Sequence, residues 1–448
     1  MPHALEFVSA RRATPARSLP RGVQRFMHTE ASGGLVLLAA AVVALVWANS
    51  PWSGAYERLW HNRFVIQLGG LRVDEDLRHF VNDGLMALFF FVVGLEIKRE
   101  VVQGELAKIR IAALPIAAAL GGMVVPALLF RGVNAGGPGA SGWGIPMATD
   151  IAFALGVLAV LGSRVPPSLK LLLLTLAIVD DVGAIVVIAV FYSGGIDATA
   201  LGFGLAGLAV TFGLVKGRVD WPPIYILLGI LTWYATYRSG VHATIAGVAL
   251  GLLTPARPLA PSETVGRWAR DLSDTPSAAQ VHQMTIVARE SVSPAEHLEE
   301  RLHPLTSFVI LPVFALANAG VEVHSNMFDA SGAAAVATGI LLGLVVGKVA
   351  GILFGGWLAV RLRVAALPDG VRWIHLAGIG ALGGIGFTVS LFITELAFEA
   401  GTLVDAAKAA VLGASALAAL LGAGVLSWVG RGTVNEPTPP SWPPSADG

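Results

Sequence analysis

The 448-residue sequence contains no cysteine, which excludes disulfide bonds and thiolate metal sites. Charged residues are scarce, since Asp, Glu, Lys and Arg make up 13% of the chain, about half the usual share of a soluble domain. No basic block with interleaved aromatic residues indicates a nucleic-acid surface. Because 55% of the residues are hydrophobic and the mean hydropathy is +0.70, the composition predicts a polytopic membrane protein.

Apolar runs of membrane length predict an all-α fold with about twelve transmembrane helices. The expected spans lie near residues 33–49, 79–97, 111–130, 142–162, 169–192, 199–216, 222–237, 239–254, 304–320, 333–359, 372–398 and 404–429. With the N-terminus inside, 22 Lys and Arg residues fall on the inner side of these spans and 7 on the outer side. Because positive residues accumulate in cytoplasmic segments, both termini are expected in the cytoplasm.

Residues 62–73 interrupt the helical pattern with two short β-prone runs around Gly69-Gly70. This pattern predicts a β-hairpin on the outer surface, and an ordinary surface loop is the alternative. Because an isolated two-stranded hairpin is marginal in water, its edge is expected to pair with a second copy of the chain. The predicted organisation is a basic cytoplasmic tail over 1–28, a transmembrane domain over 29–430 with a cytoplasmic loop at 255–300, and a Pro-rich disordered cytoplasmic tail over 431–448.

Four ionisable side chains lie inside apolar runs: Asp150, Asp180, Asp181 and Lys348. A charge at the bilayer centre costs roughly 3 kcal/mol on insertion scales, so such a residue normally has a partner or faces a polar cavity. These four residues therefore indicate an ion or proton route. Asp180 and Asp181 cannot share one helix face, because successive residues on a helix point about 100° apart.

Glycine and proline interrupt two of the expected spans. Gly and Pro residues between 142 and 146 break one run just before Thr149 and Asp150, and five glycines between 378 and 386 break the other. A broken span in each half of the chain predicts discontinuous helices beside an ion site near the membrane midplane.

Glycines also form a stripe in the run 333–359, at Gly343, Gly347, Gly351 and Gly355. Small residues at a period of four let another helix approach closely. Lys348 adjoins this stripe, so its side chain is expected to point toward the protein interior.

Several ordered motifs between about residues 25 and 428 closely resemble those of the NhaA-type sodium/proton antiporters. They are FVVGLEIKRE at 91–100, ATDIAFALG at 148–156, LAIVDDVGAI at 176–185, SGVHATIAG at 239–247, ILPVFALANAG at 310–320, VGK at 346–348 and GGIGFTVSLFI at 383–393. The resemblance implies two inverted three-helix repeats, whose discontinuous helices cross beside the ion site, and a homodimer held by the outer hairpin. It also implies an electrogenic antiporter of the bacterial inner membrane, not an enzyme, that exchanges cytoplasmic Na⁺ or Li⁺ for external H⁺ and needs no cofactor.

The resemblance assigns roles to the buried charges. Asp181 is implied as the Na⁺ ligand and proton carrier, Asp150 as a nearby contributor with Thr149 as a hydroxyl ligand, and Asp180 as the partner of Lys348. Carboxylates suit both tasks, because a hard cation prefers oxygen ligands and burial disfavours the charged form of a carboxyl group. At low pH the carboxyls would be protonated or paired with the lysine, and at high pH they would be free to bind sodium. For Lys348, a purely stabilising role that offsets the dipoles of the broken helices is the alternative.

A second set of polar residues lies near the ends of the spans. The resemblance links pH sensing to Glu96, Arg99, Glu100, Glu299 and His303 at the inner side, and to His242 near the outer side. A solvated charged rim is the alternative for the inner set, and a packed, hydrogen-bonded histidine is the alternative for His242. Asn82 and Asp83 are expected to make helix-end or interhelical contacts rather than to act as ligands.

Other functions fit the sequence less well. A sodium-coupled symporter of an organic solute needs a larger cavity with substrate-reading polar groups, whereas the spans offer only carboxylates, threonine and lysine. The HExxH and GxSxG motifs that would indicate a membrane-embedded hydrolase are absent. A channel would favour rings of carbonyls or charges. The sequence leaves open the choice among Na⁺, Li⁺ and K⁺, the proton stoichiometry and the pH threshold.

Overall fold

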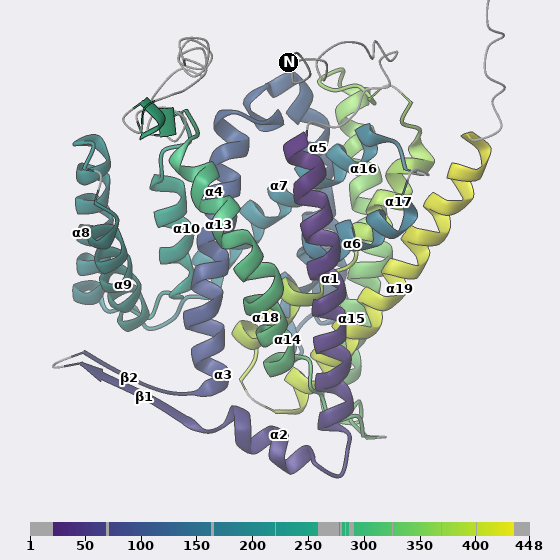
Figure 1. Cartoon of the computed structure of the whole chain (residues 1–448). Coiled ribbons are helices and arrows are strands. Elements are labelled where there is room, and N and C mark those ends of the chain that lie inside the picture. The colour runs from purple at the N-terminus through teal and green to yellow at the C-terminus, as the bar shows by residue number, and fades with distance from the viewer. Residues whose placement is uncertain are drawn as a thin grey trace, which may run out of the picture.

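The computed structural model describes residues 21–433, apart from 69–70, 163–164, 220, 259–276, 278–279, 283, 286–290, 325, 369 and 400. The elements are α1 (Arg21–Ala48), α2 (Ser53–Trp60), β1 (Arg63–Leu68), β2 (Leu71–Asp76), α3 (Leu77–Phe80), η2 (Val81–Leu85), α4 (Met86–Val102), η3 (Glu105–Ala107), α5 (Ile109–Val133), η4 (Ala140–Met147), α6 (Ile151–Leu161), α7 (Pro167–Phe191), α8 (Ala198–Lys216), α9 (Pro222–Arg238), α10 (Thr244–Leu253), α13 (Pro294–Leu305), η6 (Thr306–Ile310), α14 (Leu311–Asn318), α15 (Ala333–Leu341), η7 (Leu342–Gly347), α16 (Lys348–Arg361), α17 (Trp373–Gly383), α18 (Phe387–Ala397) and α19 (Thr402–Thr433). Most of the long helices run roughly in one direction, and the β-hairpin lies across one end of them (Figure 1). We call this end the hairpin face.

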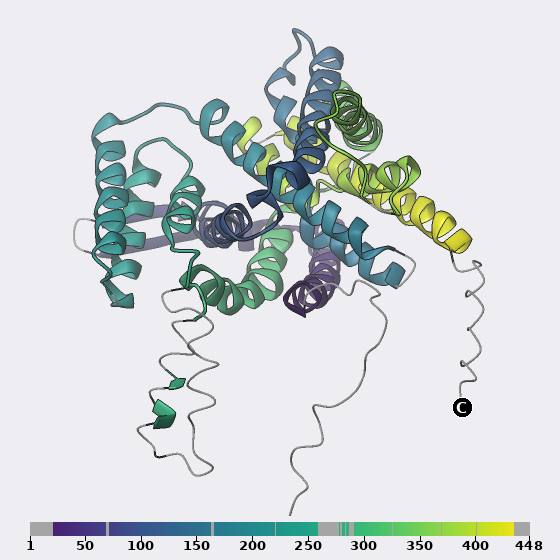
Figure 2. The same cartoon turned by 90° about the horizontal axis from the view of Figure 1, so that it is seen from above.

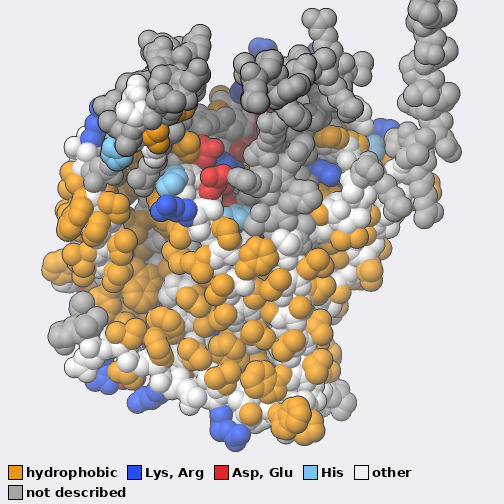
Figure 3. Space-filling view, in the orientation of Figure 1, with side chains coloured by type: hydrophobic (Ala, Val, Ile, Leu, Met, Phe, Trp, Pro, Cys, Tyr) orange, Lys and Arg blue, Asp and Glu red, His pale blue; other side chains and the backbone are white. Residues whose placement is uncertain are grey.

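Described helices occur within each of the twelve expected spans, although α10 occupies only residues 244–253 of the span at 239–254. Seven of them are long and apolar enough to cross a membrane, and two bent helix pairs raise the number to nine. The predicted helical, polytopic membrane protein is therefore confirmed. Viewed from above, α8 and α9 stand together at one edge of the molecule, and α19 lies on the opposite side (Figure 2). A broad belt of hydrophobic side chains surrounds the helices, and acidic and histidine side chains gather at the end opposite the hairpin (Figure 3).

Two predicted boundaries differ from the structure. The hairpin extends to Asp76 rather than residue 73, because β2 continues until the Asp76 side chain accepts a hydrogen bond of 2.8 Å from His79 N and starts α3. Helix α13 begins at Pro294, inside the segment predicted as a loop over 255–300, because Ser293 caps it and Ala295 packs against Leu95. Much of that loop, residues 1–20 and residues 434–448 lie outside the described residues.

The hairpin is antiparallel and is tied to α9 of the same chain. Its register pairs Arg63 with Asp76. The Tyr234 hydroxyl lies 3.2 Å from the backbone N and 3.3 Å from the backbone O of Arg72, and the Tyr237 hydroxyl donates to Glu75. The two-stranded prediction is thus confirmed, and two tyrosines hold the strands against a helix end.

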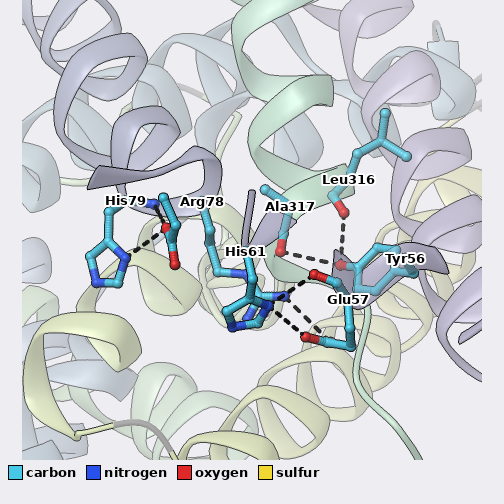
Figure 4. Close-up of polar contacts among 8 residues, drawn as sticks. Tyr56, Glu57, His61, Arg78, His79, Leu316 and Ala317 are labelled. Atoms are coloured by element: carbon cyan, nitrogen blue, oxygen red, sulfur yellow. Dashed lines mark hydrogen bonds and ion pairs between the residues drawn. The ribbon is translucent and has the colours of Figure 1, made fainter. Parts of the chain in front are cut away.

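Helix α2 lies along the hairpin face and joins α1 to α14. Tyr56 is fully buried, and its hydroxyl lies 2.8 Å from the Leu316 carbonyl oxygen and 3.1 Å from that of Ala317 (Figure 4). Next to it, Arg78 Nη2 lies 3.5 Å from Glu57 Oε1. These contacts fix the chain where it bends by 116° between α1 and α2.

Both predicted helix breaks are present, and they contact each other. One break separates η4 from α6 at residues 148–150, and the other separates α17 from α18, which meet at 48°. Asp150 N donates to the Ile385 carbonyl at 2.6 Å, and Thr149 Oγ1 lies 2.8 Å from the Gly383 carbonyl oxygen. The breaks therefore bring two distant parts of the chain together in the core.

The glycine stripe of the run 333–359 packs against α5. A Cβ atom added at Gly351 would lie 2.2 Å from the carbonyl oxygen of Gly121, so the two backbones touch. Lys348, which follows the π-helical turn η7, is fully buried.

Candidate functional site

Lys348 and Asp180 form a buried ion pair. Lys348 Nζ lies 2.6 Å from Asp180 Oδ2, and it also donates to the Met147 carbonyl at 2.5 Å. Both side chains have no exposed surface. The ammonium therefore serves two partners at once: a carboxylate on α7 and the carbonyl end of η4, where a positive charge is favourable.

Thr149 completes the contacts of Asp180. Its Oγ1 atom lies 2.6 Å from Asp180 Oδ2 and 2.8 Å from the Gly383 carbonyl oxygen. A hydroxyl has one proton, so it donates to only one of these acceptors at a time. Asp180 Oδ1 is buried and accepts no hydrogen bond from the described residues. Asp180 Oδ2 thus lies within hydrogen-bond distance of both Lys348 Nζ and Thr149 Oγ1, whereas Oδ1 has no such donor among the described residues.

Asp150 occupies the meeting point of two helix N-termini. Its Oδ1 accepts a hydrogen bond of 3.0 Å from Phe153 N at the start of α6. Its Oδ2 accepts hydrogen bonds from Thr388 N at 3.1 Å and from Thr388 Oγ1 at 2.6 Å at the start of α18. Helix N-termini favour negative charge, so both helix ends stabilise this carboxylate. The negative charge of Asp150 therefore lies at the N-termini of α6 and α18, and the positive charge of Lys348 lies at the C-terminal end of η4.

Asp181 faces a cavity instead of a lysine. The cavity has a volume of about 40 Å³, and its polar lining includes Glu96, Thr149, Asp150, Asp181, His303, Thr306, Ser307 and Thr388. The charges of Glu96, Asp180 and Asp150 all act on the Asp181 carboxylate. As the helix geometry predicts, the adjacent aspartates of α7 have different environments.

The size of the cavity limits what it can hold. A water molecule needs roughly 10–15 Å³ by this measure, so about 40 Å³ admits an alkali ion with a few waters. Pockets that enclose drug-sized molecules measure about 300–1,000 Å³. Carboxylate and hydroxyl oxygens border part of the space beside apolar side chains such as Val92 and Leu311, and oxygen is the ligand type that hard cations prefer.

Comparisons with known proteins match this combination of fold and site. The sequence model of the family described as Na⁺/H⁺ antiporter 1 matches residues 24–426. The chain belongs to this family. It is 46% identical to a Na⁺/H⁺ antiporter NhaA of Rhodopirellula baltica, over 97% of this chain and 100% of the relative. It is 47% identical to Na⁺/H⁺ antiporter NhaA 2 of Myxococcus xanthus, over 90% and 88%, and to a Na⁺/H⁺ antiporter NhaA of Oleidesulfovibrio alaskensis, over 90% and 93%.

The residues expected to sense pH in this Na⁺/H⁺ antiporter family member divide into separate groups. Glu96 and His303 line the cavity with Asp181. Arg99 Nη1 donates to Glu299 Oε1 at 2.6 Å, and burial raises the pKa of Glu299 although the charges of Arg99 and His303 act against this. Glu100 Oε1 accepts a hydrogen bond of 2.7 Å from Glu105 N at the end of α4.

His242 lies apart from the cavity of Asp181. Its Nε2 is 2.7 Å from the carbonyl oxygen of Tyr192, and because a carbonyl only accepts, Nε2 carries the hydrogen. The imidazole is therefore a packed, hydrogen-bonded group of the loop that precedes α10.

Asn82 and Asp83 lie in the π-helical turn η2, near the hairpin face. Asn318 Nδ2 on α14 donates to Asn82 Oδ1 at 2.8 Å, so this buried amide pair joins two helices. The Asp83 carbonyl accepts a hydrogen bond of 2.8 Å from Trp233 Nε1 on α9. In the antiporter chain, both residues make interhelical contacts, and neither lines the cavity of Asp181.

Sequence reasoning missed Thr388, which binds Asp150 through both its backbone and its side chain. A signal was present, because Thr388 follows the glycines of one break as Thr149 follows those of the other. Thr306 and Ser307 in η6 also line the cavity and were not predicted.

Proposed function

We propose that this protein is an electrogenic antiporter that exchanges cytoplasmic Na⁺ or Li⁺ for external protons, with Asp181 as the ion ligand and proton carrier. One observation carries the assignment: of two adjacent aspartates on α7, Asp180 is paired with Lys348, whereas Asp181 faces a small cavity that carboxylate, hydroxyl and apolar side chains border together. Family membership supports the exchanged ions, since the matched family is described as Na⁺/H⁺ antiporter 1.

The proposed cycle is a competition at Asp181. A deprotonated carboxylate neutralises Na⁺ and supplies oxygen ligands, and protonation removes both properties. The Thr149 hydroxyl and the Asp150 carboxylate border the same cavity and are proposed as further oxygen donors. Because the two ions exclude each other at one group, each passage through the membrane carries either sodium or a proton.

Lys348 is proposed as the second titrating group. The charge of Lys348 acts on Asp181, so a sodium ion bound at Asp181 repels the ammonium and favours release of the Lys348 proton from its fully buried position. Two protons would thereby exchange for one sodium. A membrane potential of 100 mV supplies about 2.3 kcal/mol per net charge, while one pH unit supplies about 1.4 kcal/mol per proton. Voltage therefore drives sodium extrusion even where the pH gradient is small.

The arrangement in the membrane is also a proposal. The two sets of helices that contain the breaks, α5 to α7 and α15 to α19, are proposed as inverted repeats. The predominance of Lys and Arg on one side favours cytoplasmic termini in a bacterial inner membrane, with the hairpin outside. We propose that the hairpin edge joins two copies into a dimer, because an exposed strand edge is a ready partner for another strand.

Dequenching of a pH-sensitive dye in acidified inverted vesicles tests the exchange. Addition of Na⁺ or Li⁺ should restore fluorescence with the wild-type protein and not with Asp181→Asn of equal abundance. If the asparagine variant responds normally, the assignment of Asp181 is wrong. Dequenching that requires an organic solute would favour a sodium-coupled symporter, but a cavity of about 40 Å³ is too small for such a solute.

A further inference from the structure

The segment that carries Thr149 and Asp150 is held mainly by contacts from outside itself. It begins as η4, an eight-residue 3₁₀ helix. Such helices have poor hydrogen-bond geometry and seldom exceed one turn, so their own bonds position them weakly. Ser390 Oγ donates to the Ile145 carbonyl at 2.7 Å, and Ser141 Oγ donates to the Ala397 carbonyl at 2.8 Å. These contacts attach η4 to α18.

Tyr192 attaches the same segment to the helix of the two aspartates. It follows the last residue of α7, and its hydroxyl donates to the Ser141 carbonyl at 2.8 Å and accepts from Gly144 N at 3.1 Å. One hydroxyl thus uses its donor and an acceptor site on two backbone groups of η4. An ordinary tyrosine hydroxyl titrates at about pH 10, so the donor proton is present at neutral pH.

The Tyr192 ring and hydroxyl approach the backbone of Gly144 so closely that only glycine fits at this position. A Cβ atom at residue 144 would lie 2.7 Å from the Tyr192 hydroxyl oxygen and 3.0 Å from a ring carbon. The Tyr192 ring also lies nearly parallel to that of Trp143, with centroids 6.3 Å apart. On its other side, the Tyr192 carbonyl accepts the hydrogen bond from His242 Nε2. Tyr192 is therefore fixed from both sides and has little freedom to move away from η4.

Helix α7 consequently meets the broken segment at two separate places. One is the contact between Asp180 and Thr149, and the other is Tyr192, about 18 Å further along the helix at 1.5 Å per residue. Two contacts at that separation fix both the position and the tilt of η4 relative to α7. We propose that Tyr192 is a positioning residue of the ion site, whose hydroxyl holds Thr149 and Asp150 in register with Asp180 and Asp181.

The test is Tyr192→Phe, which removes the hydroxyl and keeps the ring. In the vesicle assay we expect the Na⁺ concentration for half-maximal dequenching to rise three- to tenfold, as the loss of one or two hydrogen bonds implies. The maximal rate should stay within about twofold of wild type, because Asp180, Asp181 and Lys348 are unchanged. A merely structural tyrosine would lower abundance or thermal stability without changing the apparent sodium affinity.

Two matched variants accompany it. Tyr225→Phe removes a tyrosine hydroxyl whose 2.8 Å hydrogen bond to the Val219 carbonyl is exposed and distant from η4, and it should leave the sodium affinity unchanged. Gly144→Ala should weaken the sodium affinity in the same direction as Tyr192→Phe, because the added methyl group displaces the hydroxyl.

The inference rests on the proposed function, and the outcomes separate the two. A wild-type protein without Na⁺-dependent exchange would overturn the proposed function. Wild-type exchange with an unchanged half-maximal Na⁺ concentration in Tyr192→Phe, or an equal shift in Tyr225→Phe, would overturn only the positioning role. If vesicles yield too little of a variant, the Na⁺-induced rise in melting temperature of the purified protein supplies the same comparison.

Discussion

At the residue scale, the position of each charge along its helix determines its surroundings. Asp180 and Asp181 have the same chemistry, yet Asp180 accepts hydrogen bonds from Lys348 and Thr149 while Asp181 faces the cavity. A turn of about 100° between successive residues is sufficient for this difference. Neutralising Asp180 and neutralising Asp181 should therefore have different physical consequences.

Asp180→Asn should destabilise the protein more than Asp181→Asn. The first change leaves the Lys348 ammonium buried without its carboxylate, and breaking one partner of a buried pair typically costs about 3–5 kcal/mol. The second removes a charge that other acidic groups already oppose, so the fold should tolerate it while exchange is lost. Melting temperatures of the two purified variants, measured together, check this order. An Asp181→Asn variant that melts first would contradict it.

Replacements of Lys348 should separate its charge from its other roles. Lys348→Arg keeps a positive charge for Asp180 and the Met147 carbonyl, so it should preserve the fold and some exchange, although arginine does not release its proton. Lys348→Ala and Lys348→Gln should lose stability and apparent ion affinity. Thermal stability and exchange against pH should be measured in all three. Wild-type behaviour of the alanine variant would mean that Lys348 is neither proton competitor nor structural partner.

Glu299 should make stability depend on pH. Burial raises its pKa above the ordinary value of 4.5, despite the opposing charges of Arg99 and His303, so the folded state binds the proton more tightly than the unfolded state. Its contribution to stability is present below the ordinary pKa and is lost as the pH rises through the raised pKa. Between the ordinary and the raised pKa of Glu299, the melting temperature of Glu299→Gln should therefore fall less with rising pH than that of the wild-type protein. Glu399→Gln, at an exposed position, is the control and should retain the wild-type slope.

The sequence could reveal the charged part of the site but not all of its polar part. Asp150, Asp180, Asp181 and Lys348 stand out because a charge in an apolar run is costly. Thr388 does not stand out, because a threonine in an apolar span costs little and can hydrogen-bond within its own helix. Its contact with Asp150 depends on how two breaks, distant in sequence, meet in space.

At the element scale, glycine and proline predicted where helices break and where they touch, but π-helical turns left no signal. η7 directly precedes Lys348, η6 follows the helix of His303, and η2 contains Asn82. A π turn fits extra backbone into a helix and is frequent at functional sites. The orientation of side chains after such turns could not be predicted from a regular helical period, and neither could the start of α13.

The contact between α5 and α16 gives a prediction with an internal control. Gly121→Ala should lower the melting temperature and the yield, because its Cβ would lie 2.1 Å from the Gly351 carbonyl oxygen and would push the two helices apart. Gly132→Ala lies on the same helix with no atom within 4 Å of the added Cβ, so it should be neutral or slightly stabilising. Equal melting temperatures for the two variants would contradict close backbone packing as the reason for the glycine stripe.

At the scale of the whole molecule, the hairpin lies across one end of the helices (Figure 1). On the face that Figure 3 shows, acidic and histidine side chains are visible at the end opposite the hairpin, whereas α2, the β-strands and ion pairs such as that of Glu57 with Arg78 lie at the hairpin face (Figures 1, 3 and 4). Tyr234 and Tyr237 attach the hairpin to α9, and α9 stands with α8 at the edge of the molecule. The residues that line the cavity of Asp181 do not come from β1 or β2, so the hairpin can be altered without touching the ion site.

Deletion of residues 64–72 should therefore weaken dimerisation and leave the apparent sodium affinity unchanged. The deletion removes the strand edge proposed to pair with a second copy, and a paired edge supplies backbone hydrogen bonds that no side chain replaces. Native mass spectra in mild detergent should shift from dimer to monomer, while half-maximal dequenching by Na⁺ stays at the wild-type concentration. The double variant Tyr234→Phe/Tyr237→Phe, which keeps the strands but frees them from α9, should show a weaker shift toward monomer. A deletion variant that remains fully dimeric would place the contact between copies on another surface.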